Sequence, residues 1–249
     1  MESHSFAMDP NPVQEADPRD RFLAAVVSGR TFADVGGLWG TVNEKVSVAH
    51  RLGARSLAMI DVAPANDPLW SAFEERMRKL GVPEATCLNS DVVQLAQTPS
   101  PPLFDVVHCS GVLYHMPEPL RLLLALKQIT REHLVLTSVV ARSEYPHSTG
   151  SFHVPEAACL FIPALERSEK EAVAEYWKGF VGDTAVGLTR ENSFWRVEDF
   201  GPWWWLPRPE AVRALCQAAG FTVLEQVGFW DGNATTLLLS ALPAVEKGQ

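Results

Sequence analysis

A turn dense in glycine follows a short apolar run that ends at an acid, Asp34, in the first part of the chain. Three glycines come after this acid: Gly36, Gly37 and Gly40. Glycine has no Cβ and adopts φ > 0 without strain, so a turn of this kind lets bare backbone approach a ligand. Thr41 and Glu44 then have the spacing of a capping box at a helix start. The segment therefore predicts a strand, a tight turn against a ligand and a helix.

A second apolar run, residues 55–60, ends in another carboxylate, Asp61. In nucleotide-binding α/β folds, an acid about 20 residues after the glycines accepts hydrogen bonds from the two ribose hydroxyls. A dinucleotide site would show the pattern G-x-G-x-x-G, which no register of these glycines produces. The pattern is instead Asp-x-Gly-x-x-x-Gly, from Asp34 to Gly40.

Four segments of the chain, in their order and spacing, resemble class I S-adenosylmethionine-dependent methyltransferases. The first two are the glycine turn and the strand that ends at Asp61. The third strand of that family ends in polar or acidic residues beside the adenine, as Ser90-Asp91-Val92 does here. The family's fourth strand is introduced by Phe-Asp, as is the stretch 104–115, Phe-Asp-Val-Val-His-Cys-Ser-Gly-Val-Leu-Tyr-His.

A narrower resemblance concerns one branch of this family. Residues 111–115, Gly-Val-Leu-Tyr-His, are followed by a proline and a leucine-rich helix, and a later Trp-Trp-x-x-Pro segment precedes a helix that ends Ala-Ala-Gly-Phe. The branch includes the enzyme that carboxymethylates wobble uridine in tRNA and many methyltransferases that act on small molecules.

The resemblance implies a fold, a cofactor and a set of cofactor-binding residues. The fold is α/β, a doubly wound, mostly parallel seven-stranded sheet of the Rossmann-like methyltransferase type, with an inserted cap after the fifth strand. The cofactor is S-adenosylmethionine. Leu38 replaces a glycine that the family usually has, which predicts a slightly different methionine pocket. The residues expected to bind the cofactor are Asp34, Gly36, Gly37, Trp39, Gly40, Asp61, Ser90, Asp91, Val92 and Ser110.

The chemistry implied by this cofactor needs alignment more than a special side chain. Its sulfonium makes the methyl group a good electrophile, so the enzyme chiefly holds the acceptor in line with the S–methyl bond and excludes water. A histidine can remove the proton of a hydroxyl, phenol or ammonium acceptor. His115 is the first candidate for this base, Tyr114 could orient the methyl or the acceptor, and His153 is a weaker candidate. Alternatively, His115 only bonds a backbone carbonyl. No residue cluster has metal-ligand spacing, so transfer is expected to be metal-independent.

The elements that must position these residues alternate along the chain. The expected strands are 31–36, 56–62, 85–89, 104–110 and 133–140, and the expected helices are 42–53, 69–80 and 117–130. This alternation predicts a parallel sheet with helices on both faces. A helix at 209–219 and strands at 221–228 and 235–242 close the domain, and the family's reversed final strand would make that pair antiparallel. His108, inside the fourth strand, is expected to be a hydrogen-bonded core histidine.

The stretch 142–206 follows the fifth strand at the carboxyl edge, where open α/β sheets bind ligands. The capping-box spacing of Ser168 and Glu171, with apolar residues at helical spacing after it, predicts one amphipathic helix. Aromatic residues here could form a substrate cap, fasten the insertion to the core or make a dimer interface, and at least one tryptophan of the run 203–205 should serve packing alone. The expected substrate-binding residues are Tyr145, His147, Trp195, Trp203, Trp204 and Trp205.

Length and composition fit one methyltransferase domain. The chain has 249 residues, of which 47% are hydrophobic and 20% charged, enough for one large α/β core. We expect an N-terminal arm at 1–20, a cofactor-binding core at 21–141, the substrate cap at 142–206, and the C-terminal helix and closing strands at 207–249. No signal peptide or apolar window long enough to span a membrane is present, so we expect a cytoplasmic protein. The four scattered cysteines argue against a disulfide framework and a zinc site.

Net charge bears on the partner. A net charge of −9 argues against nucleic acid, which needs a basic stripe to neutralise phosphates. The sequence therefore predicts methyl transfer from S-adenosylmethionine to a small aromatic or apolar acceptor, and leaves a homodimer open. One alternative is a tRNA wobble-uridine alkyltransferase that uses a carboxylated cofactor, marked by a cation near the transferred group. Another is a non-catalytic cofactor-binding regulator.

Overall fold

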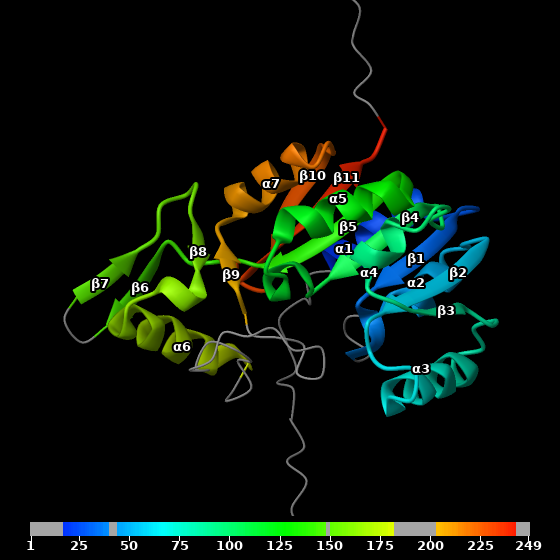
Figure 1. Ribbon diagram of the computed structural model, residues 1–249, viewed down its shortest axis with the longest axis horizontal. Helices are drawn as coiled ribbons and strands as arrows, with labels where there is room; N and C mark the ends of the chain where they lie inside the picture. The colour runs from blue at the N-terminus through cyan, green and yellow to red at the C-terminus, as the bar shows by residue number, and fades with distance from the viewer. Residues whose placement is uncertain (1–16, 40–43, 148–149, 182–202, 243–249) are drawn as a thin grey trace, which may run out of the picture.

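A seven-stranded sheet forms the centre of the molecule (Figure 1). The computed structural model describes residues 17–39, 44–147, 150–181 and 203–242. The sheet order is β10-β11-β5-β4-β1-β2-β3, with β11 antiparallel to both of its neighbours and the strands from β5 to β3 parallel. The strands are β1 (Thr31–Val35), β2 (Ser56–Asp61), β3 (Thr86–Asn89), β4 (Phe104–Ser110), β5 (Thr130–Val139), β10 (Thr222–Phe229) and β11 (Ala234–Ser240).

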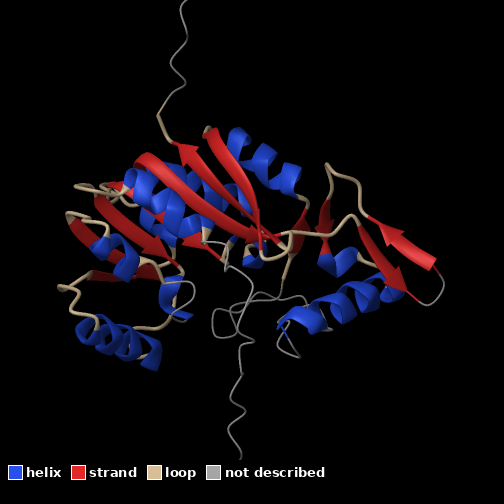
Figure 2. Ribbon diagram, turned by 180° about the vertical axis from the view of Figure 1, so that it is seen from behind, coloured by secondary structure: helices blue, strands red, loops and turns tan. Residues whose placement is uncertain are grey.

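Helices cover both faces of this sheet (Figure 2). Because successive strand side chains point to opposite faces, Phe32 and Met59 pack with one set of helices, and their neighbours Ala33 and Ile60 with the other. The first set is α1 (Pro18–Val26), α2 (Val46–Arg51) and α3 (Pro68–Lys79), and the second is α4 (Val92–Ala96), α5 (Pro119–Ile129) and α7 (Pro209–Ala218). None of the helices in the described ranges has the length and apolar character needed to cross a membrane.

The predicted doubly wound sheet, including the antiparallel closing pair, is confirmed, and one helix start differs. The helix expected at 42–53 begins only at Val46. The Glu44 carboxylate accepts the backbone N–H of Ser47 at 2.6 Å, so Glu44 itself caps the first turn. The backbone N–H of Lys45 bonds the Asp34 side chain at 2.7 Å, which holds residue 45 outside the helix. Thr41, the other half of the expected capping box, lies outside the described residues.

The insertion after β5 forms a lobe with a small core of its own, drawn beside the sheet in Figure 1. It contains the antiparallel pairs β6 (Glu144–His147) with β7 (Gly150–His153) and β8 (Cys159–Phe161) with β9 (Trp205–Pro207), and the helix α6 (Arg167–Val181). The predicted amphipathic helix is thus confirmed. It begins at Arg167 because the Glu169 carboxylate accepts the Glu166 N–H at 2.9 Å, so the capping contact lies two residues before the expected one.

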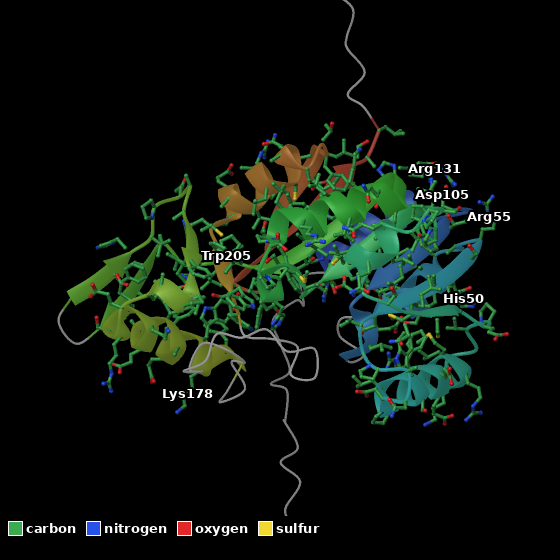
Figure 3. All side chains as sticks on the ribbon, in the orientation of Figure 1. His50, Arg55, Asp105, Arg131, Lys178 and Trp205 are labelled. Atoms are coloured by element: carbon green, nitrogen blue, oxygen red, sulfur yellow. The ribbon has the colours of Figure 1, made fainter. Side chains whose placement is uncertain are left out.

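The opposite, amino edge of the sheet is held by a charged network. The buried Asp105 accepts the N–H and hydroxyl of Thr31 at 2.9 and 3.0 Å and pairs with Arg131 and Arg55. Figure 3 shows Asp105, Arg55 and Arg131 together, away from Trp205. The Phe-Asp that introduces the fourth strand therefore ties β4 to β1 at the end of the sheet that lies away from the carboxyl edge.

Candidate functional site

The carboxyl ends of the parallel strands collect the polar residues that the sequence singles out. The glycine turn follows β1, Asp61 ends β2, Ser90 follows β3 and Ser110 ends β4. Open α/β sheets bind their ligands at this edge, beside the point where the strand order reverses. That point lies here between β1 and β4.

The glycine turn is packed so tightly that side chains would not fit. Gly36 has φ +77°, and a Cβ there would collide with the Val112 side chain. A Cβ on Gly37 would lie 2.5 Å from Oδ2 of Asp34. Leu38, where the family usually has glycine, is buried in the core beneath the turn, so its side chain points into the protein. Gly40 and the Trp39 side chain lie outside the described part of the chain.

Asp61 is a buried carboxylate at the end of β2. It accepts the N–H of Ala63 at 2.9 Å and that of Leu38 at 3.4 Å, which orients the carboxylate. Burial raises the pKa of Asp61; the backbone N–H groups of Ala63, Leu38 and Val62 lower it, and the nearby Asp34 raises it. A carboxylate has about four acceptor sites, so acceptor capacity remains for hydroxyl donors of a ligand. The arrangement fits a group that carries a vicinal diol, such as a ribose.

Asp34 lies beneath the glycine turn. Its side chain is fully buried, with Oδ2 accepting the Lys45 N–H at 2.7 Å and Oδ1 lying 2.7 Å from Nδ1 of His108. Asp34 thus supports the turn from below, and its expected contact with the cofactor stays a prediction. His108 is hydrogen-bonded in the core, as expected.

The residues after β3 form a helix start. Asp91 caps the short helix α4 by accepting the Val93 N–H at 2.7 Å, and the Ser90 N–H bonds the Asp61 carbonyl at 2.9 Å. Val92 is buried in the core. Ser90 and Asp91 are half-buried at the carboxyl edge, next to Asp61. Direct cofactor contact stays a prediction for Ser90, Asp91 and Val92.

A salt-bridged cluster holds the start of α1 against this edge. The sequence analysis did not predict this cluster. We call it the N-terminal clamp; it consists of Asp17, Arg19, Asp20, Lys45 and Ser110. Arg19 pairs with Asp17 at 2.7 Å and donates to the Ser110 hydroxyl at 3.2 Å, while Lys45 pairs with Asp17 at 2.8 Å and Asp20 at 2.6 Å. Arg19 and Lys45 are both buried. Only the helix-start pattern Asp-Pro-x-Asp at 17–20 signals the cluster in the sequence.

The N-terminal clamp makes stability depend on pH. Burial alone would raise the pKa of Asp17, but hydrogen bonds from Arg19 and Lys45 hold it well below its usual range. A lowered carboxyl pKa stabilises the fold above the unfolded pKa, and this contribution is lost as the pH falls through the folded pKa. Asp17→Asn keeps a helix cap but not the charge. We expect the variant to lose roughly 1–3 kcal/mol of unfolding free energy at neutral pH, with the gap narrowing below about pH 4.

Thermal and denaturant unfolding of wild type and Asp17→Asn between pH 3 and 8 measures this gap. Asp20→Asn is the matched control, since Asp20 is more exposed and has one ion pair, with Lys45. A gap for Asp17→Asn that stays constant down to pH 3 would contradict the role given to the clamp.

Tyr114 and His115 follow β4 in a single helical turn, η2 (Leu113–His115). Their rings lie 4.4 Å apart, and the Tyr114 ring is 4.9 Å from that of Trp203 in the lobe. Burial of the hydroxyl raises the pKa of Tyr114, so the phenol stays protonated at neutral pH. The backbone carbonyl of Tyr114 accepts a hydrogen bond from the backbone N–H of Trp204 at 2.8 Å. This turn therefore joins the core to the lobe.

His153 lies elsewhere. It belongs to β7 in the outer hairpin of the lobe (Figure 1), its side chain is 72% exposed, and its closest charged partner is Glu144 at 3.9 Å. His153 therefore lies in the lobe, apart from the turn that holds His115, and its role as a weaker candidate for the base stays a prediction. His147 belongs to β6 of the same hairpin, and its side chain lies outside the described part.

The expected substrate-binding aromatics divide by burial. Tyr145 is fully buried, with its hydroxyl accepting the backbone N–H of Arg142 at 3.0 Å, and Trp203 is buried in the lobe core. Both residues pack inside the lobe, and their substrate contact stays a prediction. Trp204 and Trp205 are half-buried, and the Trp205 indole donates to the Pro117 carbonyl at 3.0 Å. Substrate contact stays a prediction for these two. Trp195 lies outside the described residues.

Three aromatic residues that the sequence reasoning did not assign to the site link the lobe to the core. Trp177 is fully buried in α6, and its ring lies 5.0 Å from that of Trp203 and 5.9 Å from that of Trp230. Phe180 and Trp230, with rings 5.9 Å apart, are 39% and 38% exposed. Trp230 follows the carboxyl end of β10 with φ +54°, an unusual conformation for a bulky residue. A continuous aromatic series thus runs from Tyr114 to a partly exposed pair.

The chain matches a known family over most of its length. The family described as "Methyltransferase domain" matches residues 13–226. No curated protein sequence matches significantly.

Solved structures share the fold. Magnesium protoporphyrin IX methyltransferase from Synechocystis PCC 6803, solved with bound S-adenosylhomocysteine, is 14% identical with a TM-score of 0.52 over 90% of this chain and 81% of that chain. An S-adenosylmethionine-dependent methyltransferase from Mesorhizobium loti has 14% identity and a TM-score of 0.52 over 90% and 96%. Mitomycin 7-O-methyltransferase has 13% identity and a TM-score of 0.53 over 90% and 53%. At such identities the likeness establishes the fold.

Proposed function

Starting from the membership of this chain in the methyltransferase domain family, whose cofactor is S-adenosylmethionine, we propose that it methylates a small aromatic or apolar molecule. The proposal is supported by the aromatic series from Tyr114 to Trp230. Its buried members Trp203 and Trp177 hold the lobe against the carboxyl edge of the sheet, and its outer members Phe180 and Trp230 leave ring surface exposed. Aromatic side chains bind planar and apolar molecules and exclude water.

The cofactor's adenosine is assigned to Asp61 and to the half-buried Ser90 and Asp91. Asp61 has the acceptor capacity that two ribose hydroxyls need, and Gly36 and Gly37 leave backbone bare for close approach. When bound, S-adenosylmethionine supplies an electrophilic methyl group. The protein's own task is to hold the acceptor in line and keep water out.

His115 is proposed as the base and Tyr114 as an orienting group. Both lie in η2 after β4, at the edge where Asp61 and the glycine turn also lie. The raised pKa of Tyr114 keeps its hydroxyl protonated, so it can donate a hydrogen bond to an acceptor oxygen. His115 would take the acceptor's proton, a contribution that typically amounts to about 100-fold or more.

The tRNA alternative requires a cation near the transferred group. Two buried cations, Arg19 and Lys45, do lie at this edge, but both are paired with Asp17, and Lys45 also with Asp20. A carboxylated cofactor would have to displace one of these pairs, and the net charge of −9 disfavours RNA. We therefore favour a small-molecule acceptor over tRNA. We also favour a catalytic protein over a regulator, and a reaction in the cytoplasm. A homodimer through exposed aromatic or leucine residues is compatible with this function.

A label-transfer experiment tests the proposal. Purified protein is incubated with methyl-tritiated S-adenosylmethionine and an extract of its source organism, which is then separated into small molecules, RNA and protein. We expect label in the small-molecule fraction, reduced roughly 100-fold or more by His115→Ala. Label in RNA would overturn the proposed class of acceptor. Equal transfer by wild type and His115→Ala would overturn the role of His115 as the base.

A further inference from the structure

The buried pair of Asp34 and His108 joins two neighbouring strands directly beneath the glycine turn. The two residues face each other across β1 and β4, in register, and both side chains are fully buried. Nδ1 of His108 lies 2.7 Å from Oδ1 of Asp34. Because a carboxylate only accepts, His108 must carry its proton on Nδ1 and donate it. A charged acceptor makes this hydrogen bond stronger than one between neutral groups.

The other oxygen of Asp34 holds the chain on both sides of the turn. Oδ2 accepts the Lys45 N–H at 2.7 Å, and it lies where a Cβ on Gly37 would approach within 2.5 Å. The same carboxylate therefore lies against Gly37 in the turn and accepts a hydrogen bond from Lys45, the residue just before α2. A rotation of this carboxylate would therefore break the bond to Lys45 and change the contact with Gly37.

His108 decides that rotation. With Oδ1 bound to Nδ1 of His108, Oδ2 is left to face Lys45 and the turn. The outer nitrogen, Nε2, has no hydrogen-bond partner among the described residues, so only Nδ1 connects the ring to the polar network. The ammonium of Lys45 also pairs with Asp17 and Asp20 in the N-terminal clamp, so the position of Lys45 bears on the start of α1 as well.

We propose that His108 is a positioning residue for cofactor binding: through Nδ1 it fixes Asp34, and Asp34 fixes the backbone of the glycine turn. This inference rests on the proposed cofactor site. It adds to the expected cofactor-binding residues a histidine in the middle of β4, which the sequence analysis assigned only to the core.

Asn and Gln separate the two nitrogens of the histidine. The amide nitrogen of Asn superimposes on Nδ1, whereas that of Gln reaches the place of Nε2. Gln fills more of the ring's volume than Asn does. A purely structural role for His108 therefore favours Gln, and a donor at Nδ1 favours Asn.

Calorimetric titration with S-adenosylhomocysteine measures the effect in the full chain. We expect His108→Asn to bind within about threefold of wild type and His108→Gln to bind about tenfold or more weakly, since a hydrogen bond to a charged group is lost. NMR amide exchange should show the Lys45 N–H protected in His108→Asn and faster-exchanging in His108→Gln. His133→Asn, in β5, is the matched control and should bind as wild type does.

Two results would overturn the inference: equal affinity of the Asn and Gln variants, or affinities that follow their thermal midpoints with Gln the better binder. If His108→Gln does not fold, His108→Ser replaces it as the variant that lacks a donor near Nδ1. Failure of wild type to bind S-adenosylhomocysteine would instead refute the proposed function, which keeps the two outcomes apart.

Discussion

Replacing Asp61 by Ala is expected to weaken S-adenosylhomocysteine binding roughly 100-fold or more, since two hydrogen bonds to a charged acceptor would be lost. The N–H groups of Ala63 and Leu38 already orient the carboxylate before a ligand binds. Binding therefore loses little free energy to ordering this side chain. The measurement is the rise in thermal midpoint on adding the ligand. A ligand at about 100 times its Kd stabilises the wild type by roughly 2.7 kcal/mol, and in a variant that binds 100-fold more weakly this stabilisation should fall to about 0.4 kcal/mol or less.

The control for this prediction is Asp67→Ala in the following helix. Asp67 caps α3 by accepting the Leu69 N–H at 2.9 Å, so the variant should lose about 1 kcal/mol of stability. It should nevertheless keep the full ligand-induced rise. If Asp61→Ala retains that rise at the same ligand concentration, the ribose assignment is wrong.

The second large effect is expected at Trp177, the buried centre of the lobe. Truncating a fully buried Trp to Ala typically costs about 3–5 kcal/mol. The lobe has its own apolar core, separate from the two that flank the sheet, so the loss should be local. We expect faster amide exchange along α6 and loss of methyl transfer, with S-adenosylhomocysteine affinity changed by less than about threefold.

Phe180, one turn further along α6 and 39% exposed, provides the matched control. Phe180→Ala should leave amide exchange in α6 close to that of wild type, because an exposed ring contributes little to the lobe core. If Trp177→Ala abolishes cofactor binding together with transfer, the lobe and the cofactor site are one cooperative unit, and the separate roles given to them are incorrect.

The parallel core was predictable because each of its strands carries a local signal. The runs that end at Asp61 and begin at Phe104 are apolar, short and bounded by polar residues, and β2 and β4 have nearly those limits. The glycine turn could be placed for the same reason. The start of α2 could not, because it depends on Lys45 bonding Asp34, a contact between residues eleven positions apart.

The polar network around the site was less predictable, since its members come from separate elements. Arg19 meets Ser110 across 91 positions, and His108 meets Asp34 across 74. Neither pair has a spacing pattern that a single sequence reveals. Asp34 illustrates the consequence: its place in the motif was evident, but only the fold shows that its buried side chain faces a histidine of the neighbouring strand.

The structure of the lobe was predictable only in part. The helix spacing of Val173 and Trp177 predicted α6, and both residues are fully buried. The pairing of β8 with β9 joins residues far apart in the chain, and Trp230 reaches the lobe from the opposite end of the sequence. Burial then assigned Tyr145 and Trp203 to packing, a distinction that residue type alone does not make.

Calorimetric titration of the wild-type protein with S-adenosylhomocysteine, and separately with NAD⁺, tests whether the carboxyl edge of the sheet binds S-adenosylmethionine. We expect one site per chain, with a Kd on the order of micromolar for S-adenosylhomocysteine. It predicts no heat of binding for NAD⁺, because the glycine turn lacks the dinucleotide pattern. Binding of NAD⁺ with none of S-adenosylhomocysteine would contradict the assignment of the carboxyl edge to S-adenosylmethionine.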